Sequence, residues 1–278
     1  MLICVAERLR KKSPDMELGL TDRVALVAAS SQGLGKAVAR GLGAEGAKLV
    51  LCARTAKTLD ETADEIRVET GADVLAVACD VTQEEQVNAL VKTAEERFGK
   101  IDICVTNAGG PPSKSFDATT IDDWRSAVDL NLMSTLFLAR HTLPGMRERR
   151  WGRLITITSL TVKQPVDGLI LSNSVRAAVV GLVKSLSNEY GPYNVLVNNV
   201  CPGYTETDRL IELMEARAKA TGTSPDAIEK QWTQSIPLGR LARPEEFADL
   251  VVFLCSERAS YITGASIATD GGCIKGLF

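Results

Sequence analysis

A glycine-rich turn near the start of the chain is the first feature whose residues could do chemistry. It reads ASSQGLG over residues 29–35, follows the apolar run 24–29 and leads into a helix-like segment. In this context backbone N–H groups and a helix N-terminus point at one place, where they can bind a pyrophosphate. The turn therefore predicts a dinucleotide site, and a tight turn without a ligand is the alternative.

The second feature lies at the end of the next apolar run, where a dinucleotide-binding fold contacts the adenosine ribose. Ala53 and Arg54 occupy these positions, so no carboxylate is present to accept hydrogen bonds from a ribose 2'-hydroxyl. A guanidinium at Arg54 can instead bind a 2'-phosphate. These residues predict NADP in preference to NAD, and a solvated surface charge is the alternative interpretation of Arg54.

Alternating strands and helices must position these residues. Short runs rich in Val, Ile and Leu, typical of strands covered on both faces, occur at 24–29, 49–53, 74–78, 103–106, 154–158 and 195–200. Helix-length segments separate them at 33–45, 59–69, 84–98, 121–149 and 172–190. This alternation predicts an α/β fold: a Rossmann-like, doubly wound parallel sheet in one domain.

Two segments fall outside this alternation. Residues 204–236 contain two short helical patterns separated by TGTSP at 221–225, which suits a lid over a site. Residues 1–18 have no place in the pattern, and we expect a disordered extension there, with the domain at 19–278. No linker marks a second domain.

The composition excludes several classes of function. A net charge of -3 and a pI near 5.5 give no basic face for nucleic acid. The apolar run 2–6 is too short for a membrane span or a signal peptide. The 7 cysteines form no CxxC motif, and His141 is the only histidine, so we expect no metal site. Buried, reduced thiols indicate a cytoplasmic protein.

Further motifs follow in a characteristic order: Asp80-Val81, Asn107-Ala108-Gly109, PGYTETD at 202–208, Ile262-Thr263-Gly264 and Asp270-Gly271-Gly272. Together with the turn at 28–35, which resembles TGxxxGxG although Ala28 and Ala29 replace its Thr and first Gly, this set is similar to the short-chain dehydrogenase/reductase family. The resemblance covers 19–278 and is nearest to 3-oxoacyl-carrier-protein reductases. It implies cofactor contacts from Ala29, Ser31, Gln32, Gly33, Leu34, Gly35, Arg54, Asp80, Val81, Asn107, Ala108, Gly109, Arg176, Pro202, Gly203, Thr205 and Thr207.

The resemblance also implies a catalytic group of Asn, Ser, Tyr and Lys, and here it is incomplete. Asn131 and Ser159 match the first two positions. The Tyr position, thirteen residues after Ser159, holds Ser172, and the Lys position holds Arg176. Arg176 can still hydrogen-bond ribose hydroxyls. An aliphatic hydroxyl is too weak an acid near pH 7, and loss of a general acid costs a factor of about 10² to 10⁴.

Three replacements for the missing proton donor are open. Lys163, in the loop after Ser159, could reach the substrate carbonyl with an ammonium whose pKa is lowered by burial. Tyr204 could turn in from the start of the lid, although a packing role suits it better. Ser172 could relay a proton from water held by Asn131.

The sequence thus predicts an NADP-dependent oxidoreductase acting on a carbonyl or hydroxyl group of a small molecule, such as a 3-oxoacyl thioester, under a lid lined by apolar residues. A dinucleotide-binding protein with little turnover is one alternative. Another is non-redox chemistry in which Arg176 binds an anion or a leaving group. The resemblance implies a homo-oligomer, a tetramer or dimer, formed through the helices at 121–149 and 172–190.

Overall fold

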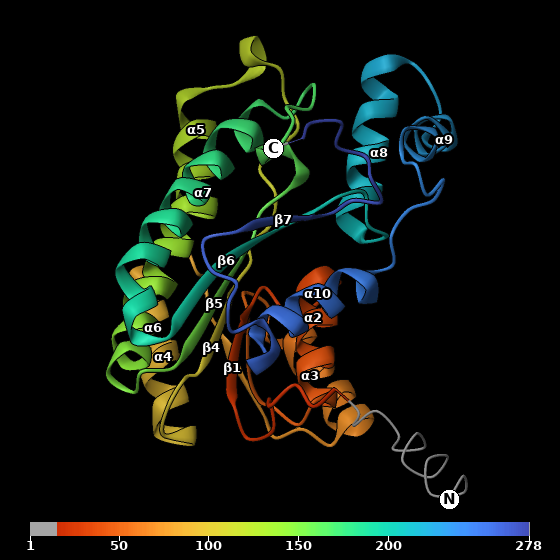
Figure 1. Cartoon of the computed structure of the whole chain (residues 1–278). Helices are drawn as coiled ribbons and strands as arrows, with labels where there is room; N and C mark the ends of the chain where they lie inside the picture. The colour runs from red at the N-terminus through yellow and green to blue at the C-terminus, as the bar shows by residue number, and fades with distance from the viewer. Residues whose placement is uncertain (1–15, 278) are drawn as a thin grey trace, which may run out of the picture.

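One seven-stranded sheet organises the computed structural model, which describes residues 16–277 (Figure 1). All neighbouring strands are parallel, in the order β3-β2-β1-β4-β5-β6-β7. The strands are β1 (Val24–Ala28), β2 (Lys48–Ala53), β3 (Val74–Ala78), β4 (Ile103–Thr106), β5 (Gly152–Ile157), β6 (Val195–Pro202) and β7 (Ser266–Thr269). The predicted doubly wound α/β fold is confirmed.

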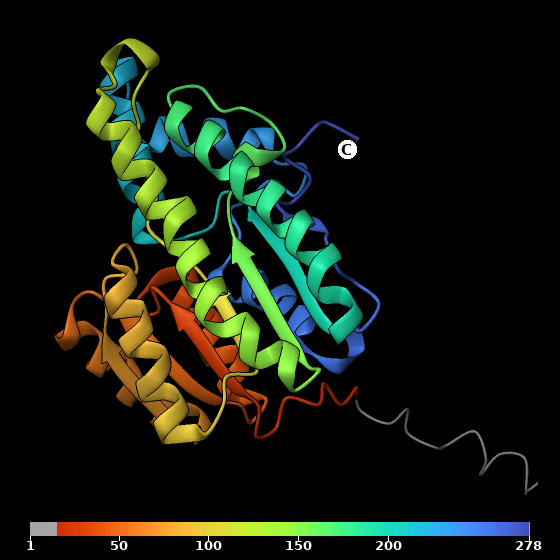
Figure 2. The ribbon, with the colours of Figure 1, turned by 90° about the vertical axis from the view of Figure 1, so that its left-hand side faces the viewer.

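Helices cover both faces of this sheet. One face carries α2 (Gly33–Ala44), α3 (Ala56–Thr70) and α10 (Pro244–Cys255), whose buried apolar residues share one core cluster. The other carries α4 (Glu84–Phe98), α6 (Ser134–Glu148) and α7 (Ile170–Tyr190), which Figure 2 shows on the same side of the sheet. The central strands β1, β4, β5 and β6 are buried at every residue, as their near-continuous apolar sequences require.

The long helix expected at 121–149 is interrupted. It consists of α5 (Ile121–Val128), a π-helical turn η2 (Asp129–Met133) and α6. Thr120 begins α5 with a capping box, in which its hydroxyl accepts the Asp123 N–H and Asp123 accepts the Thr120 N–H. A π-helical turn widens the helix locally, and such turns are frequent at functional sites. Asn131 lies in this turn and is buried.

The helical pair α8 (Asp208–Thr221) and α9 (Pro225–Ser235) occupies the segment expected to form a lid. Gly222, at a φ of 66°, ends α8, and Ser224 begins α9. The pair has a small core of its own, made of buried Leu210, Met214, Ala218, Ile228, Ile236 and Leu241. Figure 1 shows both helices standing beyond the ends of the strands, above α10.

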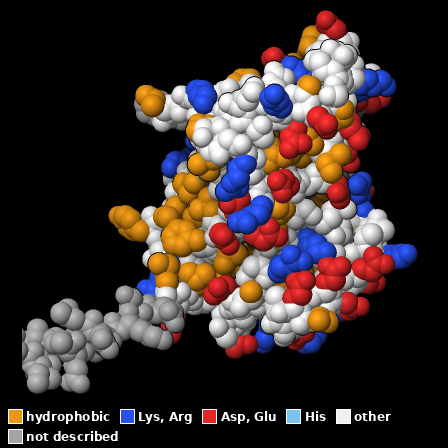
Figure 3. All heavy atoms as spheres, turned by 90° about the vertical axis from the view of Figure 1, so that its right-hand side faces the viewer, with side chains coloured by type: hydrophobic (Ala, Val, Ile, Leu, Met, Phe, Trp, Pro, Cys, Tyr) orange, Lys and Arg blue, Asp and Glu red, His pale blue; other side chains and the backbone are white. Residues whose placement is uncertain are grey.

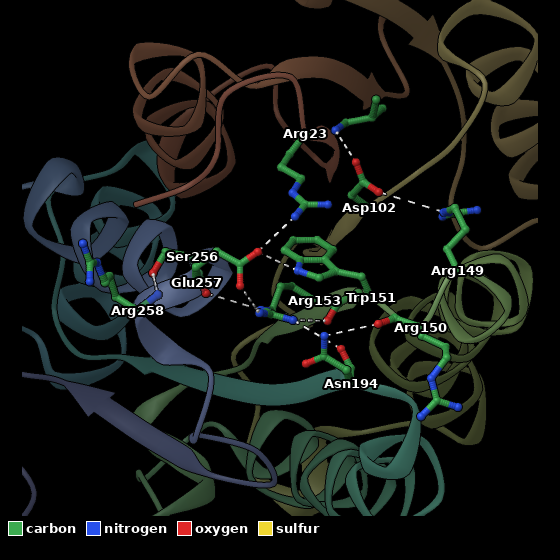
Figure 4. A network of polar contacts seen from close by, with 12 residues as sticks. Arg23, Asp102, Arg149, Arg150, Trp151, Arg153, Asn194, Ser256, Glu257 and Arg258 are labelled. Atoms are coloured by element: carbon green, nitrogen blue, oxygen red, sulfur yellow. Dashed lines mark hydrogen bonds and ion pairs between the residues drawn. The ribbon is translucent and has the colours of Figure 1, made fainter. Parts of the chain in front are cut away.

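The opposite end of the sheet is held by a network of polar contacts (Figure 4). Arg153 of β5 is completely buried, and its guanidinium carbon lies 4.3 Å from the centre of the Trp151 ring. Arg23 lies 3.6 Å from the centre of the same ring. Glu257 accepts hydrogen bonds from Arg23 Nη2 at 3.0 Å and from Trp151 Nε1 at 2.8 Å. The network therefore joins the start of β1 to the segment after α10.

The described residues also extend to the chain before β1. The Glu17 carbonyl accepts a hydrogen bond from Arg258 Nε at 2.8 Å, and the Leu18 carbonyl accepts the Glu257 N–H at 2.9 Å. The ordered structure thus begins before residue 19. The rest of the extension expected at 1–18 lies outside the described residues.

Four further short helices are present: η1 (Phe116–Ala118), η3 (Leu160–Val162), η4 (Gly191–Tyr193) and η5 (Glu257–Ala259).

The surface carries charges of both signs. On the face in Figure 3, Lys and Arg side chains are intermingled with Asp and Glu, beside a band of apolar side chains. Within residues 16–277 no helix is long and apolar enough to cross a membrane. Cys52, Cys79, Cys104 and Cys201 are buried and unpaired, as the sequence predicted.

Candidate active site

The turn after β1 adopts a strained backbone that suits close approach by a ligand. Ala29 has a φ of 48°, in the left-handed region that glycine adopts most easily, and Gly33 has a φ of 56°. Gly35 is buried against this turn: a Cβ there would lie 2.2 Å from the Ala29 carbonyl oxygen. Asn107 Nδ2 donates to the same oxygen at 3.4 Å. Gly35 and the Asn107 side chain, which both lie against the Ala29 carbonyl, thus hold the turn in this conformation.

The loop after β6 reaches this turn through Thr207. Thr207 Cγ2 would be 3.6 Å from a Cβ on Gly33, so the start of α8 lies against the predicted phosphate site. The Thr207 hydroxyl accepts the Leu210 N–H and donates to the Thr205 carbonyl. Gly203 lies so close to Asp270 that a Cβ would meet its Cα at 2.7 Å. Pro202 and Thr205 are buried beside it.

The positions predicted to contact the adenosine half lie at the ends of β2 and β3. Arg54 is exposed directly after β2. Asp80, after β3, accepts the Thr82 N–H at 3.0 Å and the Thr82 hydroxyl at 2.8 Å through Oδ1. Val81 beside it is 8% exposed. At the turn itself, Thr62 of α3 donates to the Ser31 carbonyl at 2.8 Å, while Gln32 is exposed and Leu34 is partly buried.

Asn131 and Arg176 converge on the loop after β4. Asn131 Nδ2 donates to the Gly109 carbonyl at 3.1 Å, and Arg176 Nη2 donates to the same oxygen at 3.4 Å. Arg176 Nη1 donates to Ile157 and Thr158 carbonyls at 3.2 and 2.5 Å. Asn131 Oδ1 and Arg176 Nε, both buried, have no partner among the described residues. They line one small cavity together with Asn107 and Ala108.

Arg176 is an unusually buried cation, with 7% of its surface exposed. Burial, together with the positive charge of Arg209, lowers the pKa of Arg176 to about 10. Because this value is still well above 7, the guanidinium stays charged at neutral pH. Arg176 therefore places a fixed positive charge at the wall of the small cavity that it lines with Asn131.

Three hydroxyl side chains meet at the end of β5. Ser159 Oγ accepts the Thr161 N–H at 3.2 Å and so begins η3. Thr161 Oγ1 and Ser172 Oγ lie 3.1 Å apart, and both residues are buried. Ser159 and Ser172 thus each contact Thr161, Ser159 at its backbone N–H and Ser172 at its hydroxyl. Thr161 links them, and sequence reasoning missed it.

The loops at the carboxyl ends of the strands can hold an extended dinucleotide. The turn at 29–35 offers a strained, glycine-lined backbone, Thr207 lies against Gly33, and Arg54 is free to meet a 2'-phosphate. Asn131 Oδ1 and Arg176 Nε supply a buried acceptor and a buried donor that the protein itself leaves open. The residues present therefore fit a nicotinamide dinucleotide in this groove.

Comparison with known proteins agrees with this geometry. Residues 28–273 match the family model described as enoyl-(acyl carrier protein) reductase. A 3-oxoacyl-[acyl-carrier-protein] reductase of Aquifex aeolicus is 35% identical over 257 residues, which cover 92% of this chain and 99% of the relative. This chain belongs to the short-chain dehydrogenase/reductase family.

Other family members show the same extent of similarity. A 7alpha-hydroxysteroid dehydrogenase of Escherichia coli is 32% identical over 260 residues, covering 94% of this chain and 97% of the relative. L-sorbose reductase of Gluconobacter frateurii, solved with NADPH and L-sorbose, is 35% identical with a TM-score of 0.89. That match covers 94% of this chain and 100% of the reductase. The family resemblance thus extends over the whole described fold.

Lys163 follows η3 and is partly buried, and no acceptor for its ammonium lies among residues 16–277. It lies near Cys201 at the end of β6. Burial raises the pKa of the Cys201 thiol, and the charges of Lys163 and Arg176 oppose that shift.

Tyr204 belongs to the packing of the helical pair α8–α9. Its ring stacks on Trp232, with ring centres 4.6 Å apart. Leu210 and Met214 are buried in the same cluster, whereas Ile211 is 51% exposed. A cavity of about 140 Å³ beside Tyr204 is lined by Leu241 and Phe247 and by none of the proposed catalytic residues. The structure thus places Tyr204 in the packing of this helical pair.

Proposed function

We propose that this chain is an NADP-dependent oxidoreductase that interconverts a carbonyl and a hydroxyl group on a small molecule. The observation that carries the proposal is the convergence of the turn at 29–35, Thr207 and Asn107 on one groove, with Arg54 at its far end. Similarity to L-sorbose reductase, a protein solved with NADPH, supports the choice of cofactor.

In the direction of reduction, a hydride would come from the nicotinamide of bound NADPH, and the protein's own residues must bring a proton to the carbonyl oxygen. Ser159 can orient that oxygen from the end of β5. We propose that Ser172 and Thr161, 3.1 Å apart, relay the proton from solvent, because neither hydroxyl is acidic enough to donate it outright. Lys163 is the alternative donor, since its ammonium has no acceptor among the described residues.

Arg176 stands at the lysine position of the family and has another role in this proposal. Its guanidinium is bound to the carbonyls of Gly109, Ile157 and Thr158. Because its Nη donors are bound to these backbone carbonyls, the guanidinium is not placed to pass a proton to the substrate. Arg176 therefore orders the loop after β4 and provides positive charge beneath the site.

A dinucleotide-binding protein with little turnover is the second candidate. The observation that favours it is the absence of a phenol or ammonium at residue 172, where the family proton donor belongs. This candidate predicts micromolar or tighter NADPH binding with no oxidation by any ketone. The oxidoreductase proposal predicts slow but measurable turnover.

The test is a fluorescence titration with NADPH, followed by absorbance assays with a panel of ketones, keto acids and 3-oxoacyl thioesters. Ser172→Tyr combined with Arg176→Lys should raise ketone reduction by about 10² or more, the usual contribution of a general acid. Lys163→Ala separates the two proton routes when turnover of a neutral ketone is measured at saturating concentration, because kcat then falls only if the lysine is the donor. Failure of NADPH to bind would refute the proposal.

We also propose that the protein is a cytoplasmic homo-oligomer, a tetramer or dimer, formed through α5–α6 and α7. Two apolar side chains on α5 and α6, Ile121 and Leu136, are 67% and 36% exposed. Burial of such surface stabilises association. Light scattering on purified protein should give a mass of two or four chains, and Ile121→Lys should lower it.

A further inference from the structure

The site contains a buried cation that lacks a carboxylate partner. The Arg176 guanidinium donates to three backbone carbonyls, and no carboxylate within residues 16–277 lies within ion-pair distance of it. Its Nε–H is buried and has no acceptor. Buried charges in proteins are normally paired, because carbonyl dipoles replace only part of the lost hydration. Arg176 therefore leaves positive charge available to a ligand.

A second cation binds the same loop from the other side. Arg209, in the first turn of α8, donates from Nη2 to the Pro111 carbonyl at 2.7 Å. Its guanidinium lies against Gly110, where a Cβ would approach Nε to 2.9 Å. Arg176 and Arg209 thus enclose the short loop from 109 to 111, and the charge of Arg209 contributes to the lowered pKa of Arg176.

Lys163, in the loop after η3, is a third cation, and it is partly buried. Among the described residues these three cations have one carboxylate partner, Glu212, which pairs with Arg209 at 3.0 Å and is 63% exposed. Asp270, on the neighbouring strand end, has both carboxylate oxygens occupied by the N–H groups of Gly272 and Ile274. Arg176 and Lys163 therefore have no carboxylate partner among the described residues.

We propose that the substrate is a small keto acid or hydroxy acid whose carboxylate binds among Arg176, Arg209 and Lys163, beside the hydroxyls of Ser159 and Ser172. This inference rests on the function proposed above and narrows its substrate class. A carboxylate supplies the acceptors that guanidinium groups bind best. A neutral ketone would leave Arg176 and Lys163 without a carboxylate partner among the described residues.

The test compares two acids with their methyl esters by calorimetry: pyruvate with methyl pyruvate, and acetoacetate with methyl acetoacetate. Each is titrated into the protein saturated with NADP⁺, which supports no reduction, so binding alone is measured. At least one acid should bind about tenfold or more tightly than its ester, as expected for a charge-assisted contact in a partly buried site. Equal or weaker binding of both acids would overturn the proposal.

Variants then locate the charge. Arg209→Gln and Lys163→Gln are partly exposed and leave the core intact, and each should lower the acid-to-ester affinity ratio about fivefold or more. Arg140→Gln removes the same charge from the surface of α6, where the side chain is 74% exposed, and should leave the ratio unchanged. If the acid-to-ester affinity ratio is unchanged in both Arg209→Gln and Lys163→Gln, the proposal is overturned.

Parallel NADPH titrations separate this inference from the proposed function. If Arg209→Gln weakens NADPH as much as it weakens the acid, the anion in question is the pyrophosphate of the dinucleotide, and the keto acid proposal is wrong. If neither NADPH nor NADP⁺ binds, the oxidoreductase proposal fails. The same acid and ester titrations on the cofactor-free protein then still decide whether the anion site exists.

Discussion

Substitution of Gly35 by alanine tests the geometry of the phosphate turn most directly. The new Cβ would lie 2.2 Å from the Ala29 carbonyl oxygen and 2.9 Å from the carbonyl carbon. Both atoms belong to the backbone, so neither can rotate away, and the turn must open by about 1 Å before ordinary contact distances return. Overpacking of this kind costs about 1–3 kcal/mol.

Two measurements follow from this displacement. The melting temperature should fall by about 5 °C, given the usual relation between free energy and melting temperature in chains of this size. The affinity for NADPH should fall about tenfold or more, because the N–H groups of the turn lose their common direction. Gly191→Ala is the matched control: Gly191 has an ordinary φ of -52° and no atom within 4 Å of its added Cβ.

A second substitution in the same turn should preserve or slightly raise stability, in contrast to Gly35→Ala. Ala29→Gly relieves the left-handed φ of 48° and should leave stability unchanged or slightly higher, since the gain of about 1 kcal/mol is partly offset by chain entropy. NADPH affinity should be unchanged or higher. If Gly35→Ala melts and binds NADPH like the wild type, the turn does not have the tight packing described above, and the dinucleotide assignment loses its main support.

Other substitutions test separate parts of the structure. Arg54→Ala should weaken NADPH binding about 10- to 100-fold and NADH binding less than twofold, because only NADPH carries the 2'-phosphate; equal losses in fluorescence titrations would contradict the NADP assignment. Glu257→Gln should lower the free energy of unfolding in urea by about 1–2 kcal/mol, since it removes the counter-ion of buried Arg153, whereas Asp122→Asn, at an exposed ion pair, should change it by less than about 0.5 kcal/mol. The Lys114 ammonium and the Thr120 N–H hold the pKa of Asp123 at about 2, so this carboxylate stabilises the fold above its unfolded pKa of about 4, and its contribution is lost as pH falls toward 2. Asp123→Asn should therefore flatten the acid end of a stability profile; an unaltered slope between pH 4 and pH 2 would show that the capping box contributes nothing.

The strands and most helices were predictable because their sequences carry strong local signals. The apolar runs of β3 and β4 and the amphipathic pattern of α4 fixed their ends to the residue. The interruption at Asn131 was not predictable, since Asp129–Met133 is helix-forming in sequence and the π-helical turn arises from packing against the loop after β4. Strand β7 is short and only partly buried, so its four residues gave no distinct apolar run.

The sequence indicated which residues belong to the candidate site, but it did not indicate which of them contact one another. Spacing indicated Ser159, Ser172 and Arg176, but the pairing of Ser172 with Thr161 depends on how η3 folds back on α7. Thr161 follows Ser159 at the spacing by which a serine hydroxyl accepts a nearby N–H, a signal that could have drawn attention to it. Arg209 had no such signal, because its contact with Pro111 joins residues 98 positions apart.

The link between Arg23 and Glu257 has a consequence for synthesis of the protein. These residues are 234 positions apart, and α10, which precedes Glu257, covers the apolar side of α2. At translation rates of about 5–20 residues per second, the N-terminal βαβ unit waits on the order of 10 to 50 s before its covering helix emerges. During that interval the apolar side of α2 faces water or a chaperone, so the nascent chain is most prone to aggregate before α10 has emerged.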